Sequence, residues 1–190
     1  MQRWGVRQVA SAAVLVLAML LWLQPAHAQQ PLIGGDPLVS AVLDRDYDRA
    51  KALLLAGSQP QGRDLDGRPV TLIAIANTDV RTLGLLLNYG ANPNETDRNG
   101  DTPLSQASAL GNIDAVNLLI AAGAQIDRAN RQGMTPLMRA AQAGAIGVIR
   151  RLLEVGAAVD ATDFTGRDAL SWAEVNGHQR AASILRNAGV

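Results

Sequence analysis

Three aspartates at alternating positions are the first residues in this sequence that could bind a metal ion. Asp44, Asp46 and Asp48 place carboxylates at the first, third and fifth positions of a possible calcium-binding loop. Such a loop also needs a glycine at its sixth position and a glutamate at its twelfth, where this sequence has Arg49 and Leu55. We therefore interpret the segment as an exposed turn and expect no metal site there.

The side chains that serve nucleophilic and acid–base catalysis are also scarce. The sequence has no cysteine and two histidines, His27 and His178. Because His27 falls in a predicted signal peptide, His178 is left as the one candidate base. No serine stands in the Gly-x-Ser-x-Gly motif of many hydrolases, and glycine-rich phosphate-binding loops are absent. The sequence therefore argues against an enzyme and predicts no cofactor.

A further set of carboxylates recurs at a regular interval. Asp64, Asp97 and Asp163 share one position of a 33-residue period, and Asn130 occupies the same position between the last two. Paired carboxylates can cleave glycosides when both face one cleft. The regular spacing instead indicates a structural repeat.

The repeat is visible in short phrases and in the glycines. NGDTPLSQA at 99–107, QGMTPLMRA at 132–140 and TGRDALSWA at 165–173 begin 33 residues apart. Three glycine series share the interval: Gly57, Gly90, Gly123, Gly156 and Gly189; Gly34, Gly67, Gly100, Gly133 and Gly166; and Gly111, Gly144 and Gly177. Self-similarity at this period indicates a stacked array of helical units.

One unit shows which elements must position the polar residues. Thr102 can cap a helix and Pro103 suits its first turn, where no backbone N–H is needed. Gly111 can end that helix in a left-handed conformation. A second helix then runs from about Ile113 to Gly123, and an extended, turning connection leads to the next Thr-Pro pair. Because aromatic residues make up 3% of the sequence, the core must consist of aliphatic side chains.

The first 28 residues are predicted to be a cleaved signal peptide. Arg3 and Arg7 precede an uncharged apolar run at 12–23, and Ala26 and Ala28 form the small-x-small pattern of a cleavage site. An uncleaved anchor is the alternative, but the run is shorter than the roughly 20 residues that span a bilayer. We therefore predict cleavage after Ala28, export to a bacterial periplasm and no membrane association of the mature chain.

The period and its motifs resemble the ankyrin repeat. Thr-Pro-Leu at Thr102 and Thr135 and the segments 117–127 and 151–160 carry the resemblance. It implies an all-α solenoid of about five stacked helix–turn–helix units joined by hairpin-like loops. It also implies a structural role for His178, which follows Gly177 where the family pattern often has a histidine. The predicted units are about 31–63, 64–96, 97–129, 130–162 and 163–190, and together with residues 29–30 they form one ankyrin-repeat domain over 29–190.

The sequence departs from the family pattern in two ways. The histidine that usually follows Thr-Pro-Leu is replaced in three units, by Ser105, Met138 and Ser171. In the second unit, Pro69 and Thr71 occupy the usual threonine and leucine positions, and Thr78 replaces the glycine that should end the first helix. We therefore expect the second unit to be the least stable.

The resemblance also implies a concave surface that binds another protein through its loop tips and the ends of the first helices. At the tips this surface would contain Leu65, Asp66, Arg68, Arg98, Asn99, Asp101, Arg131, Gln132, Met134, Phe164, Thr165 and Arg167. At the helix ends it would contain Asn77, Leu110, Gln142, Ala143 and Asn176. Arginine and aromatic residues are enriched at binding hot spots, so the four arginines and Phe164 are the foremost candidates.

The leading hypothesis is a non-catalytic, monomeric periplasmic protein that binds another protein as scaffold, adaptor or chaperone. It is similar to small exported bacterial ankyrin proteins, some of which are linked with stress-defence enzymes such as catalase. Two alternatives are an immunity protein that neutralises a periplasmic toxin and, from another class, a hydrolytic enzyme. The formal charge of zero gives no electrostatic reason to expect nucleic acid as the partner.

Overall fold

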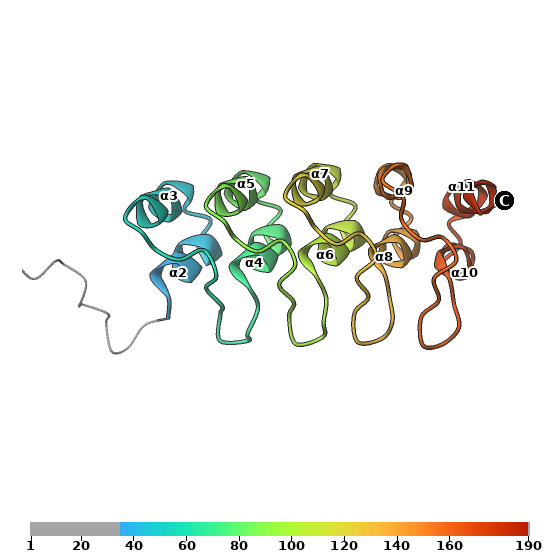
Figure 1. The fold of residues 1–190 in the computed structure, drawn as a ribbon, viewed down its shortest axis with the longest axis horizontal. Helices are drawn as coiled ribbons and strands as arrows, with labels where there is room; N and C mark the ends of the chain where they lie inside the picture. The colour runs from blue at the N-terminus through green and yellow to red at the C-terminus, as the bar shows by residue number, and fades with distance from the viewer. Residues whose placement is uncertain (1–34, 190) are drawn as a thin grey trace, which may run out of the picture. The chain divides into compact units, whose positions relative to one another are not determined.

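The computed structural model describes residues 35–189, which form ten helices in five successive pairs. The first helices of the pairs lie in one layer and the second helices in another (Figure 1). The pairs are α2 (Pro37–Leu43) with α3 (Tyr47–Leu55), α4 (Val70–Ala76) with α5 (Val80–Asn88), α6 (Pro103–Ala109) with α7 (Ile113–Ala121), α8 (Pro136–Gln142) with α9 (Ile146–Glu154), and α10 (Ala169–Val175) with α11 (Gln179–Ala188). The all-α solenoid expected from the sequence is confirmed. The predicted signal peptide and residues 31–34 of the first predicted unit lie outside the described residues.

The first helices of the later units begin at the predicted capping residues. The backbone N–H of Ser105 donates to Thr102 Oγ1 over 3.0 Å, and that of Ser171 donates to Asp168 Oδ1 over 2.7 Å. Pro103 stands in the first turn of α6, where its missing N–H costs nothing. In α4 the capping position is Pro69, which makes no side-chain cap bond. The second unit thus lacks a stabilising contact that its neighbours have.

A left-handed residue ends each first helix, as the glycine pattern predicts. Gly111, Gly144 and Gly177 have φ values of 66°, 65° and 75°. The same conformation persists at Arg45, with φ 58°, and at Thr78, with φ 55°. A β-branched residue is disfavoured there, so the fold imposes this geometry on the second unit at the cost of local strain.

The core runs continuously through the stack because each unit packs its apolar face on its neighbours. Small residues allow the first helices to approach closely, and the second helices contribute larger side chains to the core. Ala41, Ala74, Ala107, Ala140 and Ala173 share one repeat position and are fully buried. Leu86, Leu119, Leu152 and Leu185 share another and are also buried. No helix in residues 35–189 is long and apolar enough to cross a membrane.

Candidate binding surface

Four loops project from the layer of first helices (Figure 1). We call them fingers 1 to 4, comprising residues 64–68, 97–101, 130–134 and 163–167. Each is closed by a backbone bond between its first and last residue, such as Asp163 N to Arg167 O at 2.9 Å in finger 4. A glycine at the fourth position of each finger has positive φ, from 75° at Gly67 to 81° at Gly133. The fingers are therefore defined turns with a repeated geometry.

The recurring Asp/Asn position holds each finger together from inside. Asp163 Oδ1 accepts bonds from the backbone N–H groups of Thr165 and Arg167, at 2.8 and 3.0 Å. Asn130 Oδ1 accepts the equivalent bonds from Gln132 and Met134, at 2.9 and 3.0 Å. Because an amide serves as well as a carboxylate, this position has a structural role and the series is not a set of catalytic acids.

The carboxylates of fingers 1 and 4 ionise more readily than usual. The Thr165 hydroxyl, together with backbone N–H groups and the Trp172 indole N–H, outweighs the effect of burial and lowers the pKa of Asp163 to about 2. Burial raises the pKa of Asp64, but the backbone N–H and guanidinium of Arg68 outweigh it and leave that pKa below its ordinary value. Both groups are thus charged and already bonded within their own fingers.

Neighbouring fingers are bonded to each other. The backbone N–H of Arg131 donates to Asn99 O over 3.0 Å, and that of Phe164 donates to Gln132 O over 3.1 Å. Fingers 2 and 3 are joined further by Asn130 Nδ2, which donates to Asp101 Oδ1 over 2.9 Å. These bonds hold fingers 2, 3 and 4 in one rigid row.

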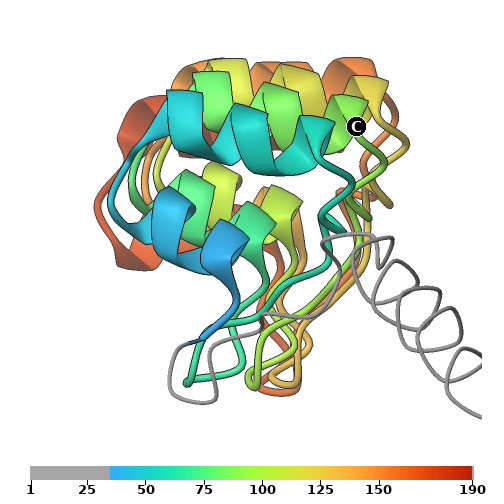
Figure 2. The same cartoon turned by 90° about the vertical axis from the view of Figure 1, so that its left-hand side faces the viewer.

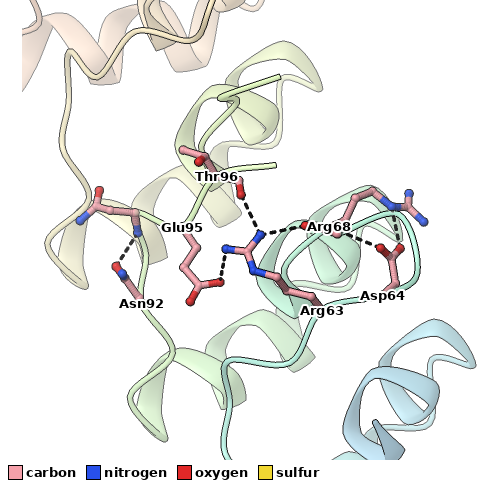
Figure 3. A network of polar contacts seen from close by, with 8 residues as sticks. Arg63, Asp64, Arg68, Asn92, Glu95 and Thr96 are labelled. Carbon is pink, nitrogen blue, oxygen red and sulfur yellow. Dashed lines mark hydrogen bonds and ion pairs between the residues drawn. The ribbon is translucent and has the colours of Figure 1, made fainter. Parts of the chain in front are cut away.

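Arg63 and Arg98 connect finger 1 with residues 95–98, just before and at the start of finger 2. Arg63 Nη1 donates to Thr96 O over 2.9 Å and to Gly67 O over 2.8 Å, and its Nη2 lies 3.1 Å from Glu95 Oε2 (Figure 3). Arg98 Nη2 donates to Leu65 O over 3.2 Å. The side chain of Arg98 therefore connects the first two fingers, whereas fingers 2, 3 and 4 are also connected by backbone bonds.

Most of the predicted tip residues are exposed, but two are not. Asp101 is 7% exposed and accepts bonds from Ser105 Oγ and Asn130 Nδ2. Met134 is 6% exposed and belongs to the hydrophobic core. The prediction that these two residues lie on the accessible tips is wrong, because the fifth residue of each of these fingers turns inward. The tip residues that remain exposed are Leu65, Asp66, Arg68, Arg98, Asn99, Arg131, Gln132, Phe164, Thr165 and Arg167.

The predicted residues at the helix ends divide in the same way. Leu110, Ala143 and Asn176 are exposed. Asn77 is half-buried, and its Nδ2 donates to Val42 O of the preceding unit over 2.9 Å. Gln142 is also half-buried, and His178 Nε2 lies 3.1 Å from its carbonyl oxygen. This contact gives His178 the structural role expected from the sequence, because it links the last two units.

The prediction from sequence missed two large, exposed apolar residues at the ends of first helices. Leu43 and Val175 end the first helices α2 and α10 at the repeat position of Gln142, and Val175 is 67% exposed. Their spacing from Gln142 could have indicated them. Leu43 also lines a hollow of ≈ 430 Å³ between α2 and finger 1, together with Val39 and Leu65.

The side chains of the described residues do not gather into a metal-binding cluster. Within residues 35–189, no group of three or more histidine, aspartate or glutamate side chains is arranged to hold a metal ion. The surface instead presents apolar and basic side chains on a rigid frame, which is suited to binding.

Five stacked helix pairs with projecting fingers define a helical-repeat solenoid, a class whose extended surfaces bind other molecules. The family model described as "Ankyrin repeats (3 copies)" matches residues 38–130 and 125–190, so the chain belongs to the ankyrin-repeat family. A search of curated proteins gave no significant match. Ankyrin repeats mediate binding to other proteins and are typically non-catalytic, which indicates a protein–protein interaction module.

Proposed function

We propose that the chain is an exported adaptor that binds one partner protein through its four fingers and the exposed ends of its first helices. The observation that carries this proposal is the exposure of two large apolar side chains on the fingers. Leu65 is 95% exposed and Phe164 is 81% exposed. A tip that is turned to solvent could hold a polar residue at either position, and burial of each side chain against a partner would stabilise a complex by roughly 1.5–3 kcal/mol.

The rigidity of the fingers supports the same proposal. Bonds within and between fingers 2 to 4 hold the backbone of Arg131 and Phe164 before any partner arrives. A pre-ordered surface avoids part of the conformational entropy loss on binding. The side chains that remain exposed can therefore contribute their contacts with little reorganisation.

A capture experiment with matched variants tests this proposal. The finger variant changes Arg68, Arg98, Arg131 and Phe164 to alanine. The control variant changes four exposed residues outside the fingers to alanine, namely Arg128, Arg150, Arg180 and Tyr89. It alters the net charge by the same amount as the finger variant. Surface substitutions usually change stability little, so both variants should melt close to the wild type. The finger variant should bind the natural partner at least about tenfold more weakly, equivalent to ~1.4 kcal/mol, and the control variant should bind it normally.

The opposite pattern would refute the assignment of the surface. If the finger variant captures the partner with unchanged affinity while the control variant loses it, binding belongs to the surface formed by the second helices and the segments that follow them. The identity of the captured protein then separates the finer hypotheses. A peroxide-defence enzyme supports a stress-related adaptor, and a toxin supports an immunity protein.

Export and oligomeric state are part of the proposal and have separate tests. Cleavage after Ala28 predicts a mature protein that begins at Gln29 and is found in the periplasmic fraction. Mass spectrometry of the purified protein identifies that terminus directly. Retention of Met1 in the cell envelope would support an anchor instead. Sedimentation analysis should give the mass of a single mature chain.

A further inference from the structure

The second residue of each finger forms a column along the stack. These residues are Leu65, Arg98, Arg131 and Phe164, and each is separated from the next by one repeat. All four are exposed. The column is therefore apolar at both ends and basic at its two central positions.

Contacts between fingers keep the column in register. In fingers 2, 3 and 4 the second residue lies against the glycine of the preceding finger. A methyl group added to Gly67 would lie 3.3 Å from Arg98 Nε, and one added to Gly133 would lie 2.9 Å from Phe164 Cδ1. Figure 2, which looks along the stack, shows the fingers lying one behind another. The four side chains thus project from a regular row.

The two central arginines lack an acidic partner within residues 35–189. The ion pairs of this part of the chain involve other arginines, among them Arg63 and Arg68, and none includes Arg98 or Arg131. The carboxylates of Asp97 and Asp101 accept bonds from their own loop and from finger 3. Asp66, on finger 1, is the exposed carboxylate nearest in sequence to the column. The middle of the column therefore presents positive charge that the protein does not neutralise.

The spacing of the column matches one form of extended peptide. Helices pack with axes about 8–10 Å apart, which sets the approximate interval between successive fingers. A polyproline II segment rises ~3.1 Å per residue and has three residues per turn, so every third side chain lies on one face at intervals of ~9 Å. A β-strand would place such side chains on alternating faces. A polyproline II segment is thus the better geometric match.

We propose that the column binds an extended acidic segment of the partner with the pattern apolar-x-x-acid-x-x-acid-x-x-apolar. The two apolar residues contact Leu65 and Phe164, and the two carboxylates pair with Arg98 and Arg131. Guanidinium groups form charge-assisted, bidentate hydrogen bonds with carboxylates. The two central pairs therefore select a negatively charged segment and fix its register along the column. This inference rests on the proposed function, because it assigns the chemistry of the partner to the same surface.

Synthetic peptides test the order of the groups. The probe is fluorescein-labelled Leu-Pro-Ser-Glu-Pro-Ser-Glu-Pro-Ser-Leu. A permuted peptide, Glu-Pro-Ser-Leu-Pro-Ser-Leu-Pro-Ser-Glu, has the same composition with the acids at its ends, and a third peptide replaces both Glu with Lys. In fluorescence polarisation at low salt, the probe should bind at least about tenfold more tightly than either control peptide. Equal affinity for the probe and the permuted peptide, or no binding at protein concentrations up to about 1 mM, overturns the proposal.

Charge reversal tests the residues. The variant Arg98→Glu/Arg131→Glu should prefer the Lys peptide to the probe, whereas Arg128→Glu/Arg150→Glu, with the same change in net charge, should keep the original preference. If the first variant does not fold, Arg98→Gln/Arg131→Gln removes the charges but retains side chains of similar reach, and it should lose the preference for acid. An unchanged preference in the reversed or neutral variant overturns the proposal, as does tighter binding of a ten-nucleotide single-stranded DNA than of the probe.

The two proposals fail separately. If the finger variant with four alanines loses the natural partner but the peptides are not discriminated, the fingers bind protein and the acidic segment is wrong. If the peptides are discriminated but the finger variant keeps the natural partner, the column recognises acidic segments and the proposed adaptor function uses another surface.

Discussion

Substitution of Gly133 by alanine should destabilise the protein more than the same substitution at Gly166. The two glycines share one position of fingers 3 and 4 and have φ values of 81° and 80°. At Gly166, no atom lies within 4 Å of an added methyl group, so Gly166→Ala tests the backbone conformation alone. A left-handed alanine costs about 1–2 kcal/mol, and reduced freedom of the unfolded chain offsets about 0.4–1 kcal/mol of that. The expected net loss is about 1 kcal/mol.

Gly133→Ala adds a steric conflict to the same backbone cost. The added methyl group would lie 3.0 Å from Phe164 N and 3.1 Å from Asp163 Cα. These backbone atoms cannot move freely, because the Phe164 N–H donates to Gln132 O over 3.1 Å. Overpacking of this kind costs about 1–3 kcal/mol. The expected total loss is therefore about 2–4 kcal/mol.

Urea unfolding of the two variants measures this difference, since the midpoint shifts with stability at constant m value. Gly67→Ala is a useful third variant, because its methyl group would meet Nε of the long Arg98 side chain at 3.3 Å and no backbone atom is among the nearest neighbours. Its loss should stay close to that of Gly166→Ala. Equal losses at Gly133 and Gly166 would show that the fingers are not in firm contact, and would refute the description of fingers 3 and 4 as one rigid row.

Four further predictions concern three single residues and the second unit. Thr78→Gly should stabilise the protein by roughly 1 kcal/mol in urea unfolding, because it removes a left-handed threonine. In the wild type, amide hydrogen exchange should be faster at 68–79 than at 135–144. Slower exchange at 68–79 would show that other contacts compensate for the substitutions in the second unit. Thr135→Ala removes the hydroxyl that accepts the Met138 N–H over 3.3 Å and should cost about 1 kcal/mol of stability, so an unchanged melting temperature would contradict its capping role. Asp163 has a pKa of about 2 in the folded protein, below its unfolded value, so the stability that its carboxylate contributes is present above pH ~4 and is lost as the pH falls towards 2. The variant Asp163→Asn, which copies Asn130, should therefore lose less stability than the wild type between pH ~4 and pH ~2, as measured by thermal melts.

Local chemistry was sufficient to predict the helical units. The capping bonds of Thr102, Thr135 and Asp168 lie within one turn of the helix that each residue begins. The left-handed glycines at 111, 144 and 177 likewise depend on backbone geometry at one position. The interval between these signals was enough to predict stacking, because a single helix pair cannot bury its apolar face.

The accessible part of the binding surface depended on the tertiary structure. Asp101 is buried because it accepts a bond from Asn130, which lies one finger further along the chain. The Asn77 side chain donates a hydrogen bond to the carbonyl of Val42, and the Arg98 side chain donates one to the carbonyl of Leu65. In both cases the acceptor belongs to the preceding unit. Residues at one repeat position have similar local sequence surroundings, but the neighbouring unit decides which side chains are covered and which remain exposed. These contacts join residues about one repeat apart, so a pattern read within one unit could not reveal them.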